Sequence, residues 1–161
     1  GPNIVAPHGD VKKNVDAAAL GAAMDNLTEA KITRSRQLLA DEDERTTVGV
    51  LLSATGAFVY RPGQFETGAF DQALSDLTSE KLRKAADLLG HTTPDYPEAM
   101  SLLLRAAGAY VDAKGRFDPK KFNATLDRMS EVDVKAVLKQ MKNEDPSRYL
   151  AVESLLLSGA R

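Results

Sequence analysis

The chain has 161 residues and a mass of 17.4 kDa, the size of one domain that can fold without disulfides or a structural metal. Its 43% hydrophobic and 27% charged residues are a globular rather than a disordered composition. The net charge of -2 gives no electrostatic reason to expect a nucleic-acid-binding protein. With no cysteine and two histidines, disulfide frameworks, thiol nucleophiles and a three-histidine zinc site are excluded.

Residues 1–9 show neither helical nor strand periodicity, and we predict a flexible arm there, in which His8 has no function. Gly1-Pro2 is typical of the pair left when a protease removes a tag, so we expect the native chain to extend further. A targeting segment could precede residue 3. The sequence therefore leaves two localisations open: the cytoplasm of the source cell, or the cytoplasm of a host cell into which the protein is secreted. The longest weakly polar run, 48–60, is too short to span a bilayer.

An internal repeat organises residues 10–161. Shifted by 52 positions, residues 51–89 align with 103–141 without a gap, and ten of the 39 pairs are identical, where random pairing would give roughly two or three. In a fainter first copy, at an offset of 50, Leu20 and Met24 fall where Phe70 and Leu74 stand. A partial copy at the end repeats 102–107 at an offset of 53. We therefore predict a single domain of three units with approximate bounds 10–61, 62–113 and 114–161.

Each unit is predicted to consist of three helices. Asp118-Pro119 is typical of an N-cap followed by a first-turn proline, Ser130 with Asp133 of a capping box, and Gly90 of a helix C-cap. Strand signals are weak throughout. The predicted fold is all-α, with about nine helices as three tandem three-helix repeats in a short solenoid or a compact bundle. The expected helices span 11–26, 28–40, 44–60, 66–76, 79–89, 96–112, 118–128, 131–142 and 146–159.

Two glycines, Gly56 and Gly108, are placed by this prediction inside the third helix of their units. Glycine in a helix costs about 1 kcal/mol relative to alanine, so a glycine there usually has a packing reason. Each lies in an Ala-x-Gly-Ala cluster. We expect each to permit a close helix crossing that a larger side chain would block.

In the two copies related by the offset of 52, the turn before a helix contains the motif Gly-x-Phe, which begins at Gly63 in the first and at Gly115 in the second. The second turn resembles a decayed EF-hand calcium loop, in which a glycine makes the sharp turn and an apolar residue two positions later packs on the core. Aligned on Gly115, this loop has Tyr110 first and Lys121 last, where calcium needs carboxylates. We therefore expect a helix–turn–helix joint whose phenylalanine plugs the interior, without bound metal.

Residues that differ between the copies are the candidates for partner binding, because shared residues build the fold. The second turn has four cations within eight residues, which could contact phosphate or an acidic partner, or could be a solvated face. No nucleic-acid motif accompanies them, so we expect no nucleic acid. A second set surrounds His91, which Asp95 could orient. The candidate partner-binding residues are Lys114, Arg116, Lys120, Lys121, His91, Asp95 and Tyr96.

The segment 36–45 resembles the Arg-x-Leu-Arg and acidic motif of secreted oomycete effectors, with Leu39 in place of the second arginine. The same residues fit the repeat as the end of one helix and an acidic joint. There the run 41–44 suits the N-terminus of the next helix through the helix dipole. We favour the structural interpretation because the repeat already accounts for Leu38 and Leu39.

Groups for catalysis are scarce. The sequence has no Gly-rich phosphate loop and no metalloprotease motif, and His91 has no evident nucleophile or pocket beside it. We predict no catalytic residue, no cofactor and no metal. The expected function is a non-enzymatic helical-repeat module, an adaptor or scaffold, that binds a protein or peptide partner. The alternatives are a secreted effector that acts on a host protein and an enzyme built around His91.

Overall fold

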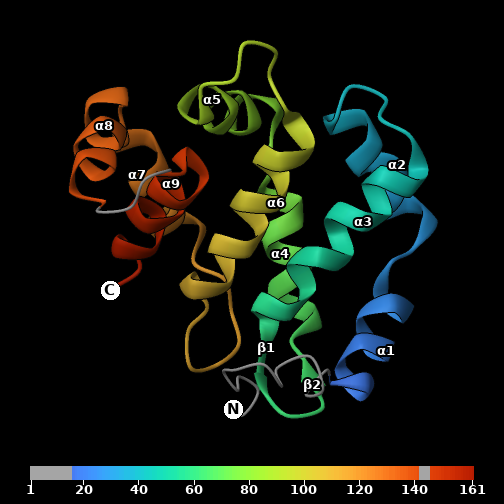
Figure 1. The fold of residues 1–161 in the computed structure, drawn as a ribbon. Coiled ribbons are helices and arrows are strands. Elements are labelled where there is room, and N and C mark those ends of the chain that lie inside the picture. Colours follow the sequence, from blue (N-terminus) through green and yellow to red (C-terminus); the bar gives the residue numbers. More distant parts are fainter. Residues whose placement is uncertain (1–15, 142–145) are drawn as a thin grey trace.

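The computed structural model describes residues 16–141 and 146–161. Within them it has nine α-helices, two short 3-10 helices and one two-stranded hairpin (Figure 1). The predicted all-α fold is confirmed, whereas the predicted arm, His8 and the first residues of the 11–26 helix lie outside the described residues. The helices are α1 (Ala17–Asn26), α2 (Glu29–Leu38), α3 (Glu44–Thr55), α4 (Thr67–Asp76), α5 (Ser79–Leu89), α6 (Tyr96–Ala107), α7 (Pro119–Arg128), α8 (Glu131–Gln140) and α9 (Arg148–Ser158).

Local sequence explains where these helices start and stop. A side-chain oxygen at the N-cap accepts a backbone N–H of the first turn in every described α-helix except α4. The predicted cap at Asp118 and the capping box of Ser130 with Asp133 are both present. Gly90 ends α5 with a φ of 73°, the left-handed conformation that favours glycine.

The third helix of the first two predicted units is shorter than expected. α3 ends at Thr55 and continues as the 3-10 helix η3 (Gly56–Phe58), and α6 ends at Ala107 and continues as η4 (Gly108–Tyr110). An antiparallel hairpin of β1 (Val59–Arg61) and β2 (Gln64–Phe65) follows η3, and a single bridge between Val111 and Phe117 follows η4. The predicted helical ends 59–60 and 111–112 are therefore wrong. Gly63 and Gly115, each with a φ of 77°, reverse the chain instead.

Helices α3, α6 and α9 lie side by side through the middle of the molecule (Figure 1). α5 packs on α6 and α9, α8 on α9, and α1 on α3 and β2. α6 is the central helix, and seven of its 12 residues are buried. None of the helices in the described part of the chain is long and apolar enough to cross a membrane.

An aromatic cluster recurs at the predicted spacing of 52. The ring of Phe70 in α4 meets Phe58 edge-on at 5.3 Å between centroids and lies 5.5 Å from Phe65. The ring of Phe122 in α7 meets Tyr110 edge-on at 5.1 Å and lies 5.7 Å from Phe117. Edge-to-face pairs at such distances are favourable beyond their buried area. As predicted, the phenylalanines after the two glycine turns plug the core, with Phe65 9% and Phe117 7% exposed.

Gly56 and Gly108 have different surroundings. A Cβ atom on Gly108 would collide with the backbone and side chain of Ala57, whereas a Cβ on Gly56 would have nothing within 4 Å among the described residues. The predicted close approach is therefore confirmed at Gly108 and wrong at Gly56. The reason is that η3 packs against η4 and brings Ala57 to Gly108, whereas no atom of the described residues reaches the equivalent position beside Gly56. Both glycines also lie after the end of the α-helix rather than inside it.

Candidate interaction cleft

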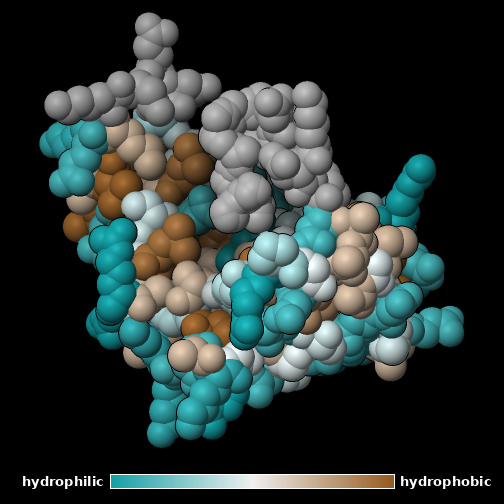
Figure 2. Space-filling model, turned by 90° about the horizontal axis from the view of Figure 1, so that it is seen from below, coloured by the Kyte–Doolittle hydropathy of each residue, from teal (hydrophilic) through white to brown (hydrophobic). Residues whose placement is uncertain are grey.

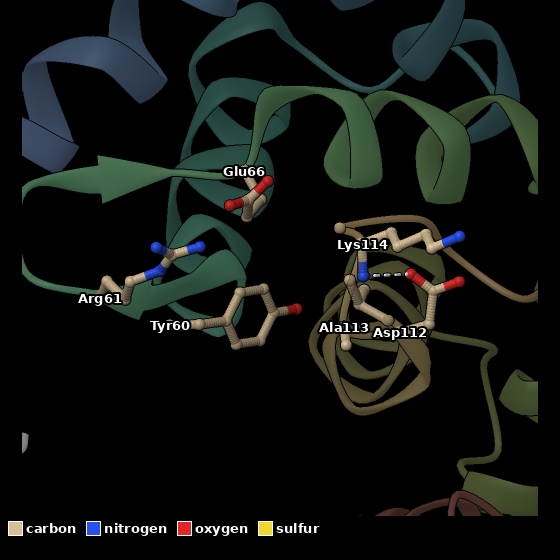
Figure 3. Close-up of a pocket in the computed structure, with 8 residues that line it drawn as sticks. Tyr60, Arg61, Glu66, Asp112, Ala113 and Lys114 are labelled. Atoms are coloured by element: carbon tan, nitrogen blue, oxygen red, sulfur yellow. Dashed lines mark hydrogen bonds between the residues drawn. The ribbon is translucent and has the colours of Figure 1, made fainter.

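Two chain reversals meet at one end of the molecule. The hairpin 59–66 follows α3 and the turn 111–118 follows α6, and because α3 and α6 pack side by side, both turns lie at the lower end in Figure 1. Between them is a cleft of about 400 Å³ (Figure 3). Seen from below, this end of the molecule shows patches of hydrophobic side chains bordered by hydrophilic ones (Figure 2). The cleft is lined by Tyr60, Arg61, Glu66, Val111, Asp112, Ala113, Lys114 and Gly115.

Tyr60 connects the first turn to η4, the 3-10 helix that leads into the second turn. Its hydroxyl donates a hydrogen bond of 2.6 Å to the carbonyl oxygen of Gly108, and its ring points toward the second turn (Figure 3). Burial of the hydroxyl, with a smaller contribution from the charge of Glu66, raises the pKa of Tyr60 well above its ordinary range. The residue is still 48% exposed, so part of its side chain is accessible to solvent.

Asp112 organises the second turn. Its Oδ1 accepts the backbone N–H groups of Lys114 at 2.8 Å and Arg116 at 3.0 Å. These backbone hydrogen bonds, the one from Arg116 first, lower the pKa of Asp112. Its carboxylate is thus engaged in holding the turn. Throughout the described residues, no group of three or more potential metal ligands lies together.

The cations of the second turn do not form one group. Lys114 lines the cleft, and Lys120 is exposed outside it. Arg116 Nε lies 3.3 Å from Asp112 Oδ2, and Lys121 Nζ donates to the carbonyl oxygen of Ala160 at 2.9 Å. Of the four predicted cations, only Lys114 lies in the cleft.

A cation of the first turn, Arg61, lies in the cleft with Lys114 (Figure 3). Within 16–141 and 146–161, neither side chain has an ion-pair partner. Glu66 is half-buried in the same cleft, and its Oε2 lies 2.9 Å from the point that a Cβ on Gly115 would occupy. Figure 3 shows the guanidinium of Arg61 on the side of the cleft where Glu66 lies, whereas the side chain of Lys114 extends from the opposite wall past Asp112, away from Tyr60.

The second predicted set of residues lies at the opposite end of α6. His91, Asp95 and Tyr96 lie at or before the start of α6, whereas the cleft lies beyond its end. The 12 residues of this helix extend about 18 Å along the axis, so the two sets are not one site. His91 Nε2 lies 2.7 Å from Glu98 Oε1, whereas Asp95 caps α6 by accepting the N–H of Glu98. The orienting partner of His91 is therefore Glu98, and our assignment of Asp95 to that role is wrong. Tyr96 is half-buried against the core.

Tyr60, Arg61, Glu66 and Asp112 were not predicted as site residues. Comparison of the two copies identified the charged residues of one turn, but it could not predict that the two turns lie next to each other in the structure. The offset of 52 was the signal that could have identified them. It makes α3 and α6 equivalent helices, and when two equivalent helices pack side by side, the turns that follow them come together.

The segment 36–45, which resembles an effector motif, has a structural role: it joins α2 to α3. Arg36 Nε donates to the carbonyl oxygen of Glu42 at 2.8 Å, Leu39 is 3% exposed, and Asp43 caps α3. The predicted structural role of 36–45 is confirmed, and the effector function stays a prediction.

Comparisons of the chain with protein families, with curated proteins and with solved structures found no match.

Proposed function

We propose that this protein is a non-enzymatic helical-repeat interaction module whose cleft between the turns 59–66 and 111–118 binds an acidic segment of a protein partner. The observation that carries the proposal is the meeting of Arg61, Lys114 and the half-exposed Tyr60 in one cleft. Arginine and tyrosine are the side chains that most often dominate the binding energy of protein interfaces.

The charge around the cleft favours an acidic partner. The second turn with the first residues of α7, 112–121, carries four cations and two carboxylates, and both carboxylates are engaged. Asp112 accepts backbone N–H groups of its own turn, and Asp118 caps α7. Arg116 pairs with Asp112 and Lys121 donates to the carbonyl oxygen of Ala160. Within the described residues, Lys114 and Lys120 are therefore the cations of this stretch that remain for charge-assisted hydrogen bonds to a partner.

The lining of the cleft is held in place before any partner arrives. The hydrogen bond from Tyr60 to Gly108 holds one side, and the backbone hydrogen bonds to Asp112 hold the other. A surface that is already ordered loses less conformational entropy on binding. This order is typical of a binding surface, and it supports a role in recognition.

The proposal is tested by affinity capture with the full chain from a lysate of its source cells. Three baits are compared: the wild type, Arg61→Glu/Lys114→Glu in the cleft, and Arg83→Glu/Lys139→Glu on α5 and α8. The two variants change the net charge equally, and both control residues are exposed. We expect a partner that the wild type and the control retain and the cleft variant loses. Equal capture by all three baits would overturn the assignment of the cleft.

The secreted effector remains our second candidate function. It predicts that the specific partner is found in a lysate of host cells and is missing from the lysate of source cells. The same three baits therefore separate an internal adaptor from an effector.

A further inference from the structure

The first helix leaves open two positions that are core in the later units. Leu20 is 40% and Met24 54% exposed, whereas their counterparts in α4, Phe70 and Leu74, are 0% and 4% exposed. The helix phase is the same, because Ala19 and Ala23 of α1 are buried, as are the matching alanines of α4. The difference is thus in what covers the helix, not in how it is turned.

The equivalent face of the helix is covered in two other places in the chain, on α4 and on α7. On α4 the cover is Phe58, the last residue of η3, and on α7 it is Tyr110, the last residue of η4. In both cases an aromatic side chain on the 3-10 turn that ends the preceding helix packs edge-on against the phenylalanine. For α1, no described element supplies such a residue.

The same missing neighbour explains the open space at Gly56. η3 touches both α4 and η4, so the segment that brings Phe58 to Phe70 also brings Ala57 against Gly108. The counterparts of Phe70 and Gly108 are Leu20 and Gly56, and both are exposed. Leu20 is in α1, which packs against α3, and Gly56 is the residue that directly follows α3 at the start of η3. Leu20, Met24 and Gly56 therefore form a copy of the internal docking surface, and we call them the open face.

We propose that the open face docks an α-helix of a partner protein whose last turn carries a small residue followed by Phe or Tyr. The occupant is defined by the chain's own interfaces, in which Ala57-Phe58 covers the equivalent surface. A second copy of this chain fits less well through its own last helix. When the glycines that cap the three helices, Gly56, Gly108 and Gly159, are aligned, the sequence Gly159-Ala160-Arg161 after α9 has arginine where Phe58 and Tyr110 stand.

The probe is a fluorescently labelled synthetic peptide of residues 44–58, the α3–η3 segment, titrated with the full chain. We expect saturable binding that weakens about tenfold or more with Met24→Asp or Gly56→Leu in the chain, or with Phe58→Ala in the peptide. Val132→Asp on α8, where Val132 is 75% exposed, is the matched control and should bind normally. Arg61→Glu/Lys114→Glu should also bind normally, so failure of the cleft proposal and failure of this one are distinguishable.

Three results would overturn this inference. The first is a lack of saturable binding. The second is binding that Met24→Asp leaves unchanged, which would place the peptide at the internal sites on α4 and α6. The third is a concentration-dependent dimer of the wild type, seen by analytical ultracentrifugation and abolished by Met24→Asp, which would assign the open face to a second copy.

Discussion

The backbone oxygen of Ala57 occupies the space that a Cβ atom on Gly108 would need. This contact brings the end of α3 against the end of α6, and the hydroxyl of Tyr60 donates to the carbonyl oxygen of the same glycine. The position of the cleft therefore depends on a glycine at 108, because both turns start from this crossing.

The first prediction compares the two equivalent glycines. Both have right-handed helical backbone angles, so alanine is allowed at either by the backbone alone. We expect Gly56→Ala to raise the free energy of unfolding by about 0.5–1 kcal/mol. Gly108→Ala should lower it by about 1–3 kcal/mol through the clash with Ala57. Urea denaturation of the two variants measures both values, and changes of the same sign would contradict the close approach.

This pair also shows how far the sequence could predict the fold. Capping signals such as Asp118 and Gly90 are local, so they were read correctly from neighbouring residues. Gly56 and Gly108 share the pattern Leu-Leu-x-Ala-x-Gly-Ala-x-Val, so it is the neighbouring element at Gly108 that distinguishes them. The hairpin after η3 was missed because strands of three and two residues are too short for a period of two to show.

A second prediction concerns the aromatic core. Phe70→Ala removes a ring that is 0% exposed and packed against Phe58 and Phe65, so it should cost about 3–5 kcal/mol of stability. Leu20→Ala, at the equivalent place in α1, should cost less than about 1 kcal/mol because Leu20 is half-exposed. Thermal and urea denaturation of both variants provide the comparison. A large loss with Leu20→Ala would show that this position is covered in solution.

A third prediction concerns Arg148, which joins three helices. It donates to the carbonyl oxygen of Leu88 at the end of α5 and, at 2.7 and 2.9 Å, to the carboxylate of Glu131 at the start of α8. Arg148→Met should lower the free energy of unfolding by about 1–3 kcal/mol near neutral pH.

Acid should reduce the effect of Arg148→Met. The hydrogen bond from Arg148, more than the Coulomb attraction of that residue, lowers the pKa of Glu131 below its usual value of 4.5. A lowered pKa in the folded state stabilises the protein above the unfolded pKa, and this contribution is lost as the pH falls through the folded value. Urea curves at about pH 7 and about pH 3 should therefore show a smaller difference between wild type and variant in acid. A difference in unfolding free energy between wild type and variant that is the same at both pH values would contradict the ion pair. Glu131→Gln, which removes this pair and leaves the hydrogen bond to Leu88, is the control.

The candidate site was less predictable than the fold for a physical reason. Lys114 was found because it differs between the copies, but Arg61, which lines the same cleft, is 53 positions earlier in the sequence. Only the packing of α3 against α6 places the two in one cleft. Tyr60 has no aromatic counterpart in the second copy, where Asp112 stands, so the repeat gave no reason to select it.

The central claim, that Arg61 and Lys114 bind an acidic segment, is tested most directly by one dissociation constant. It is measured between the purified captured partner and Arg61→Glu/Lys114→Glu, beside the wild type and Arg83→Glu/Lys139→Glu. We expect the cleft variant to bind at least about tenfold more weakly, since it replaces attraction by repulsion, and the control to bind like the wild type. A dissociation constant of the cleft variant equal to that of the wild type would contradict the account.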